Sequence, residues 1–482
     1  MSTTNDSTYR LIEETPTPPT PLEALAPRST SPAEQRHTAV KPPERLVSLD
    51  AFRGFIMLML AAHGFGILAL SKSPPDSPLW TIIDRDSLQW IAFHFNHPPW
   101  QASFVPGTHD AAIGPQWLHF GVSFWDLIQP AFMFMVGVAM PYSFGRREVM
   151  GQSRWRRIFH AAVRSLVLIL MGVFLYSLNS SSTNWIFPNV LAQIGLGYFF
   201  VSLLIGRKKW VQGLALVTIL VGTWIGIHVT PAPEGVDPAS LNAKVENGEI
   251  YAPPYRQWSK NLNAFHTFDV WFLNQFPRPK EAGEFRFNGG GYQTLNFVPS
   301  MATMILGLLC GELLLSDRSR RRKFWYLVAA GVICWGLGVF FGATCCPIVK
   351  RIWTPSWALF SGGYVIGMLA LFYLLFDILP FRKLAFPLVV LGMNSILVYF
   401  MGELMFGWLA ANVHRHFGGA IRWVGGVIAD WFRLFPQPPD STTTSGAVLV
   451  DAFLPVINAT GAVLLIWLFC WWLYRQRIFL RV

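Results

Sequence analysis

Two histidines and a tryptophan lie within the short stretch HFNHPPW, residues 94 to 100, of a chain that is otherwise apolar. The imidazole of a histidine titrates near neutral pH, so it can accept a proton or act as a nucleophile. His97 is followed by two prolines, which restrict the backbone between His97 and Trp100. The stretch fits a reactive histidine held beside a tryptophan. It equally fits an interfacial histidine with Trp100 in the aromatic belt of a membrane protein.

Asp126 and Gln129 are polar residues inside an apolar run, SFWDLIQPAFMFMVG, at residues 123 to 137. Pro130 in the same run loosens a helix, and a carboxylate in a membrane needs a donor or a cation beside it. Asp126 is therefore a candidate functional residue. A position at the end of the helix would instead make it an ordinary hydrated carboxylate.

Polar residues also accompany apolar runs at both ends of the chain. Asn394, Ser395 and Glu403 occur in LGMNSILVYFMGEL, residues 391 to 404. Asp50 and Arg53, in SLDAFRGF, stand three residues apart and share one helical face, where they can pair or direct a charge at a ligand. The alternative for this pair is a capping aspartate and an arginine whose head group reaches the membrane surface.

Two further motifs have weaker individual meaning. Gln193, in NVLAQIGLGYFF, lies alone on an apolar face, which favours an interhelical hydrogen bond. Tyr292 belongs to GGGYQTLNFVPS, residues 289 to 300, a glycine-rich segment that can approach a ligand closely or simply bend the chain.

The elements that position these residues must be membrane helices. The 482 residues are 52% hydrophobic and 13% charged, with a mean hydropathy of +0.37, which a water-soluble fold does not accommodate. We predict an all-α polytopic membrane protein with ten transmembrane helices, or eleven if the short segment Leu404–Val413 is half of another. The predicted spans are Ala51–Leu70, Phe120–Phe144, Ala161–Leu178, Phe187–Ile205, Trp210–Val229, Leu295–Leu315, Phe324–Phe341, Ser356–Phe376, Leu384–Met401 and Ala452–Leu473.

The distribution of basic residues predicts the orientation. Short loops that retain Lys and Arg stay cytoplasmic, and basic residues follow every even-numbered span. Both termini are therefore predicted to be cytoplasmic, with outer loops at 71–119, 230–294 and 402–451. Lys350 and Arg351, after the seventh span, are the exception. Topology and anionic lipid account for most of the formal net charge of +11, which leaves little reason to expect nucleic-acid binding.

Residues 1–47 are rich in Pro, Thr, Ser and Glu without apolar periodicity, which predicts a disordered cytoplasmic tail. The remaining 48–482 are predicted to form one transmembrane domain. Five cysteines have neither the spacing of metal ligands nor that of a disulfide framework, so we expect no metal. Phosphate-binding loops and serine-hydrolase elbows are likewise missing from the sequence.

Four motifs in order carry a resemblance to a known family. They are LDAFRG at the first span, WDLIQPAFMFMVGVAMPYS in the second, VLAQIGLGY in the fourth and GMNSILVY late in the chain. Together, over roughly residues 46 to 475, they resemble the membrane acyltransferases related to heparan-alpha-glucosaminide N-acetyltransferase. The resemblance implies transfer of an acetyl group from cytosolic acetyl-CoA to the amine of a glucosamine-type sugar or glycan on the outer side. It also implies a homodimer in the lipid bilayer, here expected to be a bacterial inner membrane.

The resemblance further implies that a histidine in an HxxW pattern, in the first outer loop, is the essential residue. His97 and Trp100 match that pattern, although 19 residues, QASFVPGTHDAAIGPQWLH, then intervene before FGVSFWDL. If these residues are not an insertion, His119, seven residues before Asp126, competes with His97. His63, within the first span, could reach the same site from below.

Roles for the polar residues follow from this expected reaction. His97 would act as base or acyl carrier, Asp126 would fix it, and Asn394 would donate to the oxyanion. The expected CoA contacts are Asp50, Arg53, Gln129, Gln193 and Ser395, of which Ser395 and Gln129 are also alternative oxyanion donors. The expected acceptor contacts are Trp100, Trp258, Tyr292 and Glu403, because flat rings suit the faces of sugars. The rival hypothesis is a transporter or exporter of a sugar or glycan intermediate, although the two halves of the chain show no evident internal repeat.

Overall fold

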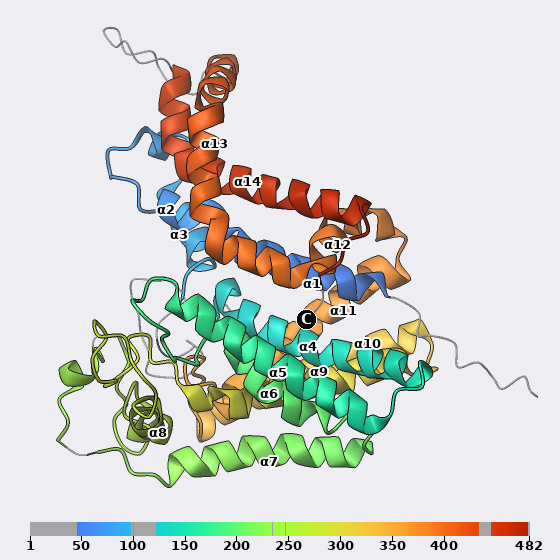
Figure 1. Ribbon diagram of the computed structural model, residues 1–482. Helices are drawn as coiled ribbons and strands as arrows, with labels where there is room; N and C mark the ends of the chain where they lie inside the picture. Colours follow the sequence, from blue (N-terminus) through green and yellow to red (C-terminus); the bar gives the residue numbers. More distant parts are fainter. Residues whose placement is uncertain are drawn as a thin grey trace, which may run out of the picture. The chain divides into compact units, whose positions relative to one another are not determined.

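The structure is a computed structural model that describes residues 46–97, 100, 122–233, 235–245, 247–432 and 445–480. The predicted tail lies almost entirely outside these residues, and His119 lies outside them as well. The described residues form helices and no strand (Figure 1). The α-helices are α1 Val47–Ala61, α2 Ile67–Leu70, α3 Arg85–Phe93, α4 Phe124–Val149, α5 Arg154–Ser177, α6 Val190–Ser202, α7 Lys209–His228, α8 Ala264–Leu273, α9 Phe297–Leu315, α10 Arg320–Thr344, α11 Pro355–Tyr373, α12 Phe386–Met393, α13 Ser395–Phe432 and α14 Ser445–Arg475.

Fewer helices are able to cross a membrane than the ten that the sequence predicts. Eight helices in the described ranges are long and apolar enough, and a bent pair, α1 with His63–Leu70, makes up to nine. The predicted span Phe187–Ile205 corresponds to α6, whose 13 residues extend about 20 Å and fall short of the ~30 Å hydrocarbon core. The predicted span Leu384–Met401 is interrupted at Asn394, where α12 ends.

The most buried spans are α4, α9 and α11, and their packing depends on close backbone approach. α4 lies against α9 (Figure 1). A Cβ on Gly137 of α4 would collide with the carbonyl of Met304, and a Cβ on Gly307 of α9 would collide with the carbonyl of Phe134. Glycines that let two helix backbones touch are the usual means of packing in lipid, where burial of apolar surface from water gives no driving force. α5, α7 and α10 are far less buried and present apolar side chains outward.

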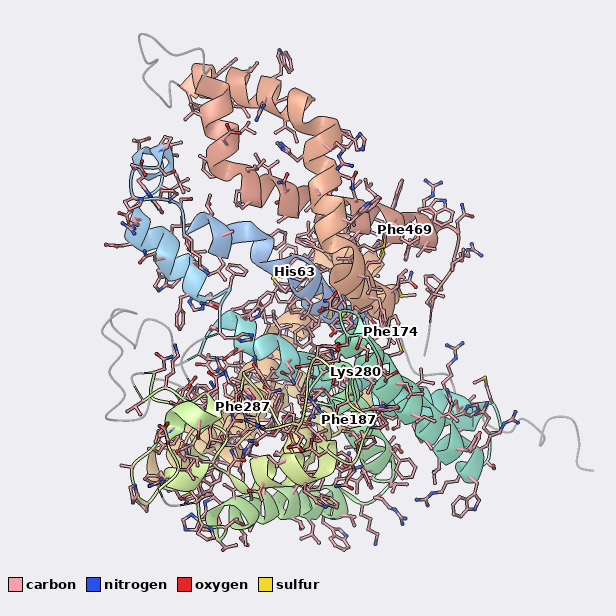
Figure 2. The ribbon with its side chains drawn as sticks, turned by 60° about the vertical axis from the view of Figure 1, so that its left-hand side comes forward. His63, Phe174, Phe187, Lys280, Phe287 and Phe469 are labelled. Atoms are coloured by element: carbon pink, nitrogen blue, oxygen red, sulfur yellow. The ribbon has the colours of Figure 1, made fainter. Side chains whose placement is uncertain are left out.

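The first span is broken rather than continuous. His63, Gly64, Phe65 and Gly66 all have positive φ, between 45° and 71°, and the two helical parts meet at 46°. The imidazole of His63 lies at this break (Figure 2), where its Nε2 is 3.2 Å from the carbonyl oxygen of Gly402 in α13. The break therefore turns the chain toward α3 and residues 94–97.

The predicted outer loop 402–451 is largely helical in the structure. α13 continues through Leu404–Val413 to Phe432, 38 residues in all, and is bent along its course (Figure 1). It packs along α14, and the two form a long hairpin (Figure 1). Apolar residues throughout this segment, among them Trp423 and Trp431, explain why the helix does not stop at the expected membrane boundary.

One end of the bundle gathers the beginning of α1, the α9–α10 turn, the segment after α11 and the chain's last described residues. The carboxylate of Asp377 accepts hydrogen bonds from the backbone N–H groups of Val47 and Ser48, at 3.2 and 3.1 Å. Arg320 donates to the Asp377 carbonyl at 2.9 Å, and the Arg382 guanidinium is 3.6 Å from the Asp377 carboxylate. This is the end at which the basic residues collect, and α4 runs from the opposite end toward it.

Candidate functional site

His97 and Asp126 meet at the opposite end of the bundle, where α4 begins. Nδ1 of His97 lies 2.7 Å from Oδ1 of Asp126. α3 carries the chain to this point, and the N–H of Trp125 donates to the carbonyl of His94 at 2.9 Å, which joins the segment after α3 to α4. Ser123 caps α4 by accepting the Asp126 N–H at 3.2 Å. The two side chains are thus set by the ends of two helices.

Lys350 is the third member of this group, and its functional position was not predicted from the sequence. Its Nζ donates to Oδ1 of Asp126 at 2.8 Å and lies 3.4 Å from Nδ1 of His97. Lys350 and Asp126 are 7% and 5% exposed, so the ion pair is almost completely withdrawn from solvent. Burial by itself would lower the pKa of Lys350, but the charge of Asp126, the hydrogen bond to Asp126 and the nearby Tyr292 together raise that pKa above its usual value.

The imidazole of His97 remains accessible, with its side chain 42% exposed. When Nδ1 carries the proton and donates it to Asp126, the lone pair of Nε2 points away from the carboxylate. This arrangement provides a base or nucleophile whose orientation is fixed by a buried, charge-assisted hydrogen bond.

The segment between α10 and α11 places Lys350, and the segment of residues 247–296 secures it. Arg351, the next residue, donates to the carbonyl of Gly290 at 3.4 Å and is 3.8 Å from the carboxylate of Glu249. The carbonyl of Arg351 accepts from the amide of Asn296 at 2.7 Å. Lys350 and Arg351, the exceptions to the basic-inside pattern, therefore both make contacts that hold the site together. That exception was the one available sequence signal for Lys350.

Trp100 is a structural anchor of the site. It is 2% exposed, and its Nε1 donates to the carbonyl of Trp258 at 3.2 Å. A Cβ on Gly291, which has φ +78°, would lie 2.6 Å from the Trp100 ring. Trp258 is fully buried too, so neither ring offers the free face that the expected role in sugar binding requires. Tyr292 is half-buried, and it is near enough to Lys350 to raise the pKa of the lysine.

Two glutamines were also predicted at the site, Gln129 in α4 and Gln193 in α6. Gln129 follows Asp126 by three residues on the same face of α4 and is half-buried. Gln193 donates to the carbonyls of Phe187 and Thr294, at 3.1 and 3.0 Å, and so joins the beginning of α6 to the segment before α9. The latter contact is the interhelical hydrogen bond that an isolated glutamine favours.

Asn394 and Ser395 lie at the break between α12 and α13. The Asn394 amide donates to the carbonyl of Ile478 at 3.2 Å and accepts the N–H of Leu480 at 2.9 Å. Both polar atoms of the fully buried side chain therefore hold the chain's last described segment. The structure does not bring Asn394 to His97, so it does not agree with an oxyanion role for Asn394. Ser395, the next residue, begins α13 at the same break.

Asp50 lines a cavity of about 630 Å³ at the basic end of the bundle, and Arg53 lies one turn further along α1. The cavity combines cationic and aromatic groups. Its lining residues are Val47, Asp50, Arg382, Lys383, Phe386, Val389 and Tyr474. Among the described residues, no three His, Cys, Asp or Glu side chains are grouped so that they could hold a metal ion.

Glu403 lies on α13, exposed, with its carboxylate near the imidazole of His63. The ring of His63 also packs against Phe406, with centroids 4.4 Å apart. Glu403 and His63 thus lie near each other. They come from α13 and from the break in the first span, whereas His97 lies between α3 and α4. The alternative histidine, His119, lies outside the described residues.

Comparison with known proteins gives one distant relative. No protein-family model matches the chain. The chain is 23% identical over 417 residues to human heparan-alpha-glucosaminide N-acetyltransferase, a match that covers 76% of this chain and 54% of the relative. The chain thus spans about half the length of the curated relative it matches. The apolar helices and the similarity to this relative together identify the chain as an integral membrane protein that is distantly similar to an N-acetyltransferase.

Proposed function

We propose that the protein transfers an acetyl group from acetyl-CoA to the amine of an amino sugar or glycan on the outer side of the membrane. The observation that carries the proposal is the His97–Asp126 pair, 2.7 Å apart, at the beginning of α4. The distant similarity to an N-acetyltransferase supports the choice of acetyl-CoA and an amine. An accessible imidazole fixed by a buried carboxylate suits acyl transfer because that reaction must remove a proton from the attacking nucleophile.

In the proposed reaction the amine nitrogen attacks the thioester carbonyl, the C–N bond forms and the C–S bond breaks. Nε2 of His97 takes the proton that the amine loses. The CoA sulfur leaves as a thiolate, and the proton held by the imidazolium passes to it, which restores neutral His97. Asp126 accepts a hydrogen bond from Nδ1–H of His97 throughout and stabilises the imidazolium that forms. His97 could instead carry the acetyl group between two such steps. An acetyl group on His97, detected by mass spectrometry after acetyl-CoA is added without acceptor, would distinguish the second route.

The cavity at the basic end of the bundle is the proposed site for the nucleotide part of CoA. Arg382 and Lys383 supply positive charge for its phosphates, and Tyr474 and Phe386 supply rings for its adenine. Asp126 and Tyr142 lie on the same helix, 16 residues or about 24 Å apart, and Tyr142 is close to Asp377. The thioester would therefore have to extend along α4 to reach His97. Arg53, on α1, adds a cation on the way.

Purified protein in lipid vesicles, supplied with labelled acetyl-CoA outside and glucosamine inside, tests the proposal. Labelled N-acetylglucosamine inside the vesicles, formed together with free CoA outside, supports acetyl transfer across the membrane. A mixed result, with acetylation only when both substrates share one side, would retain the enzyme and reject the transmembrane route.

The second candidate function is transport of a sugar or glycan intermediate. The break in the first span, at His63–Gly66, favours it because interrupted helices commonly form the binding sites of carriers. The same vesicles distinguish the two functions. With labelled glucosamine and unlabelled acetyl-CoA both supplied outside, uptake of unmodified glucosamine without release of CoA would support a carrier.

A further inference from the structure

Lys350 places a buried positive charge against the atoms that orient His97. Its Nζ and the Nδ1 of His97 both lie within hydrogen-bond distance of one oxygen, Oδ1 of Asp126, at 2.8 and 2.7 Å. Lys350 also approaches Nδ1 itself, at 3.4 Å. The imidazole and the ammonium therefore share a single carboxylate oxygen.

The charges around His97 come from three elements. Asp126 contributes a negative charge from α4, and Lys350 contributes a positive charge from the segment between α10 and α11. Tyr292, in the segment before α9, is close to Lys350, whereas Arg351 is directed at Glu249. Asp126 and Lys350 together are neutral. If Lys350 were missing, His97 would face an isolated buried carboxylate, which strongly favours an imidazolium.

We propose that Lys350 is a positioning residue that neutralises Asp126 and thereby keeps His97 unprotonated and available as a base. Asp126 still fixes the orientation of the imidazole through Nδ1. Because Lys350 already neutralises its charge, Asp126 binds the imidazolium less strongly than it would alone. The proton that His97 takes from a nucleophile is then released again instead of being retained. The role of His97 as a base rests on the proposed function. The effect of Lys350 and Asp126 on the protonation of His97 can be measured without turnover.

The reaction of His97 with diethylpyrocarbonate tests the coupling, because only the unprotonated imidazole reacts. The rate of modification of the His97 peptide is followed by mass spectrometry as a function of pH, in detergent-solubilised protein. Replacement of the cation, Lys350→Met, should move the midpoint of this profile to higher pH by roughly one unit or more. Lys350→Arg, which keeps the charge, should leave the midpoint in place. Lys260→Met, which removes another buried lysine from a carboxylate pair at 3.0 Å, is the matched control and should leave it in place as well.

Asp126→Asn provides a test with the opposite sign, which also serves if Lys350→Met does not fold. It leaves Lys350 as an uncompensated cation beside His97, so the midpoint should move to lower pH. Unchanged midpoints in Lys350→Met and Asp126→Asn would overturn the inference. An equal shift in Lys350→Arg and Lys350→Met would also overturn it, because geometry rather than charge would then be responsible. The expected shifts in a protein that transfers no acetyl group would support the charge coupling and refute only the proposed function.

Discussion

His97 and Asp126, 29 residues apart in the sequence, are joined by a hydrogen bond of 2.7 Å between Nδ1 and Oδ1. The side chain of Asp126 is 8% exposed, whereas that of His97 is 42% exposed. One partner is thus held within the protein, and the other extends into accessible space. This asymmetry is what a base with a fixed orientation needs, because only the outward nitrogen has to meet a substrate.

Removal of the imidazole is the first prediction. His97→Ala should lower acetyl transfer by about 100-fold or more, which is the usual contribution of a general base, and should leave CoA binding unchanged. Turnover of purified protein and calorimetric titration with CoA measure the two effects. His94→Ala, which removes an imidazole three residues earlier, is the control. Normal turnover in His97→Ala combined with its loss in His119→Ala would transfer the role to His119.

Loss of the carboxylate charge is the second prediction. Asp126→Asn should reduce kcat by roughly 100-fold with little change in KM for acetyl-CoA, because an amide no longer stabilises the imidazolium. It should also destabilise the fold by about 3–5 kcal/mol, since Lys350 then remains buried without its counter-charge. Thermal and denaturant unfolding of Asp126→Asn, Lys350→Met and the double variant test this. The double variant should be more stable than either single variant, and strictly additive losses would contradict the ion pair.

The sequence predicted the all-helical membrane architecture because long apolar runs in a membrane protein leave the backbone few alternatives. The number of spans was less predictable. Whether α12 and α13 form one helix depends on Asn394 and its bonds to Ile478 and Leu480, which are contacts from more than 80 residues away. Periodicity and composition carry no information about such contacts.

The candidate site shows the same limit. Asp126 and His97 were identifiable because a carboxylate in an apolar run and an HxxW pattern are local features. Lys350 lies 224 residues after Asp126, and only the fold shows that the two meet. Trp100 was assigned to substrate binding because tryptophan suits that role. In the structure, the Trp100 ring is buried in space that is open only because Gly291 has no side chain.

The contact between Gly291 and Trp100 gives the third prediction. Gly291→Ala should disturb Trp100 and the position of His97, because the new Cβ would lie 2.6 Å from the ring at a φ of +78°. We expect about 10-fold lower acetyl transfer and a lower unfolding temperature. Gly235→Ala has a similar φ of +71° with nothing within 4 Å, and so measures the strain of the backbone without the clash. Equal losses in both variants would show that Trp100 does not position the site.

The cavity at the basic end provides the fourth prediction. Arg382→Ala should weaken CoA binding about 10-fold, because a charge-assisted hydrogen bond to phosphate contributes about 1.5–3 kcal/mol. Arg321→Ala, which removes an exposed cation from the first turn of α10, should change the affinity for CoA little. Calorimetric titration with CoA and with dephospho-CoA measures the effect. Equal affinity of wild type and Arg382→Ala for CoA would remove this cavity from the proposed site.

Asp269, in α8, gives the last prediction, which concerns the dependence of stability on pH. Burial raises the pKa of this carboxyl to about 7, and the hydrogen bond from the N–H of Thr294, at 2.9 Å, only partly opposes the effect of burial. A carboxyl with a raised pKa in the folded state prefers to be protonated there. Its favourable contribution is therefore complete below about pH 4, where the unfolded chain is also protonated, and is lost as the pH rises through 7.

Asp269→Asn removes this dependence, because the amide stays neutral and its oxygen can still accept the N–H of Thr294. Relative to wild type, the variant should gain stability as the pH rises from about 4 to 8, by at most about 4 kcal/mol. Unfolding temperatures from tryptophan fluorescence at several pH values measure the difference. Asp84→Asn is the control, since hydrogen bonds from Ser87 lower the pKa of that exposed carboxyl, and it should show no such gain. A constant difference between Asp269→Asn and wild type across this range would mean that Asp269 is already ionised in the folded protein at pH 4.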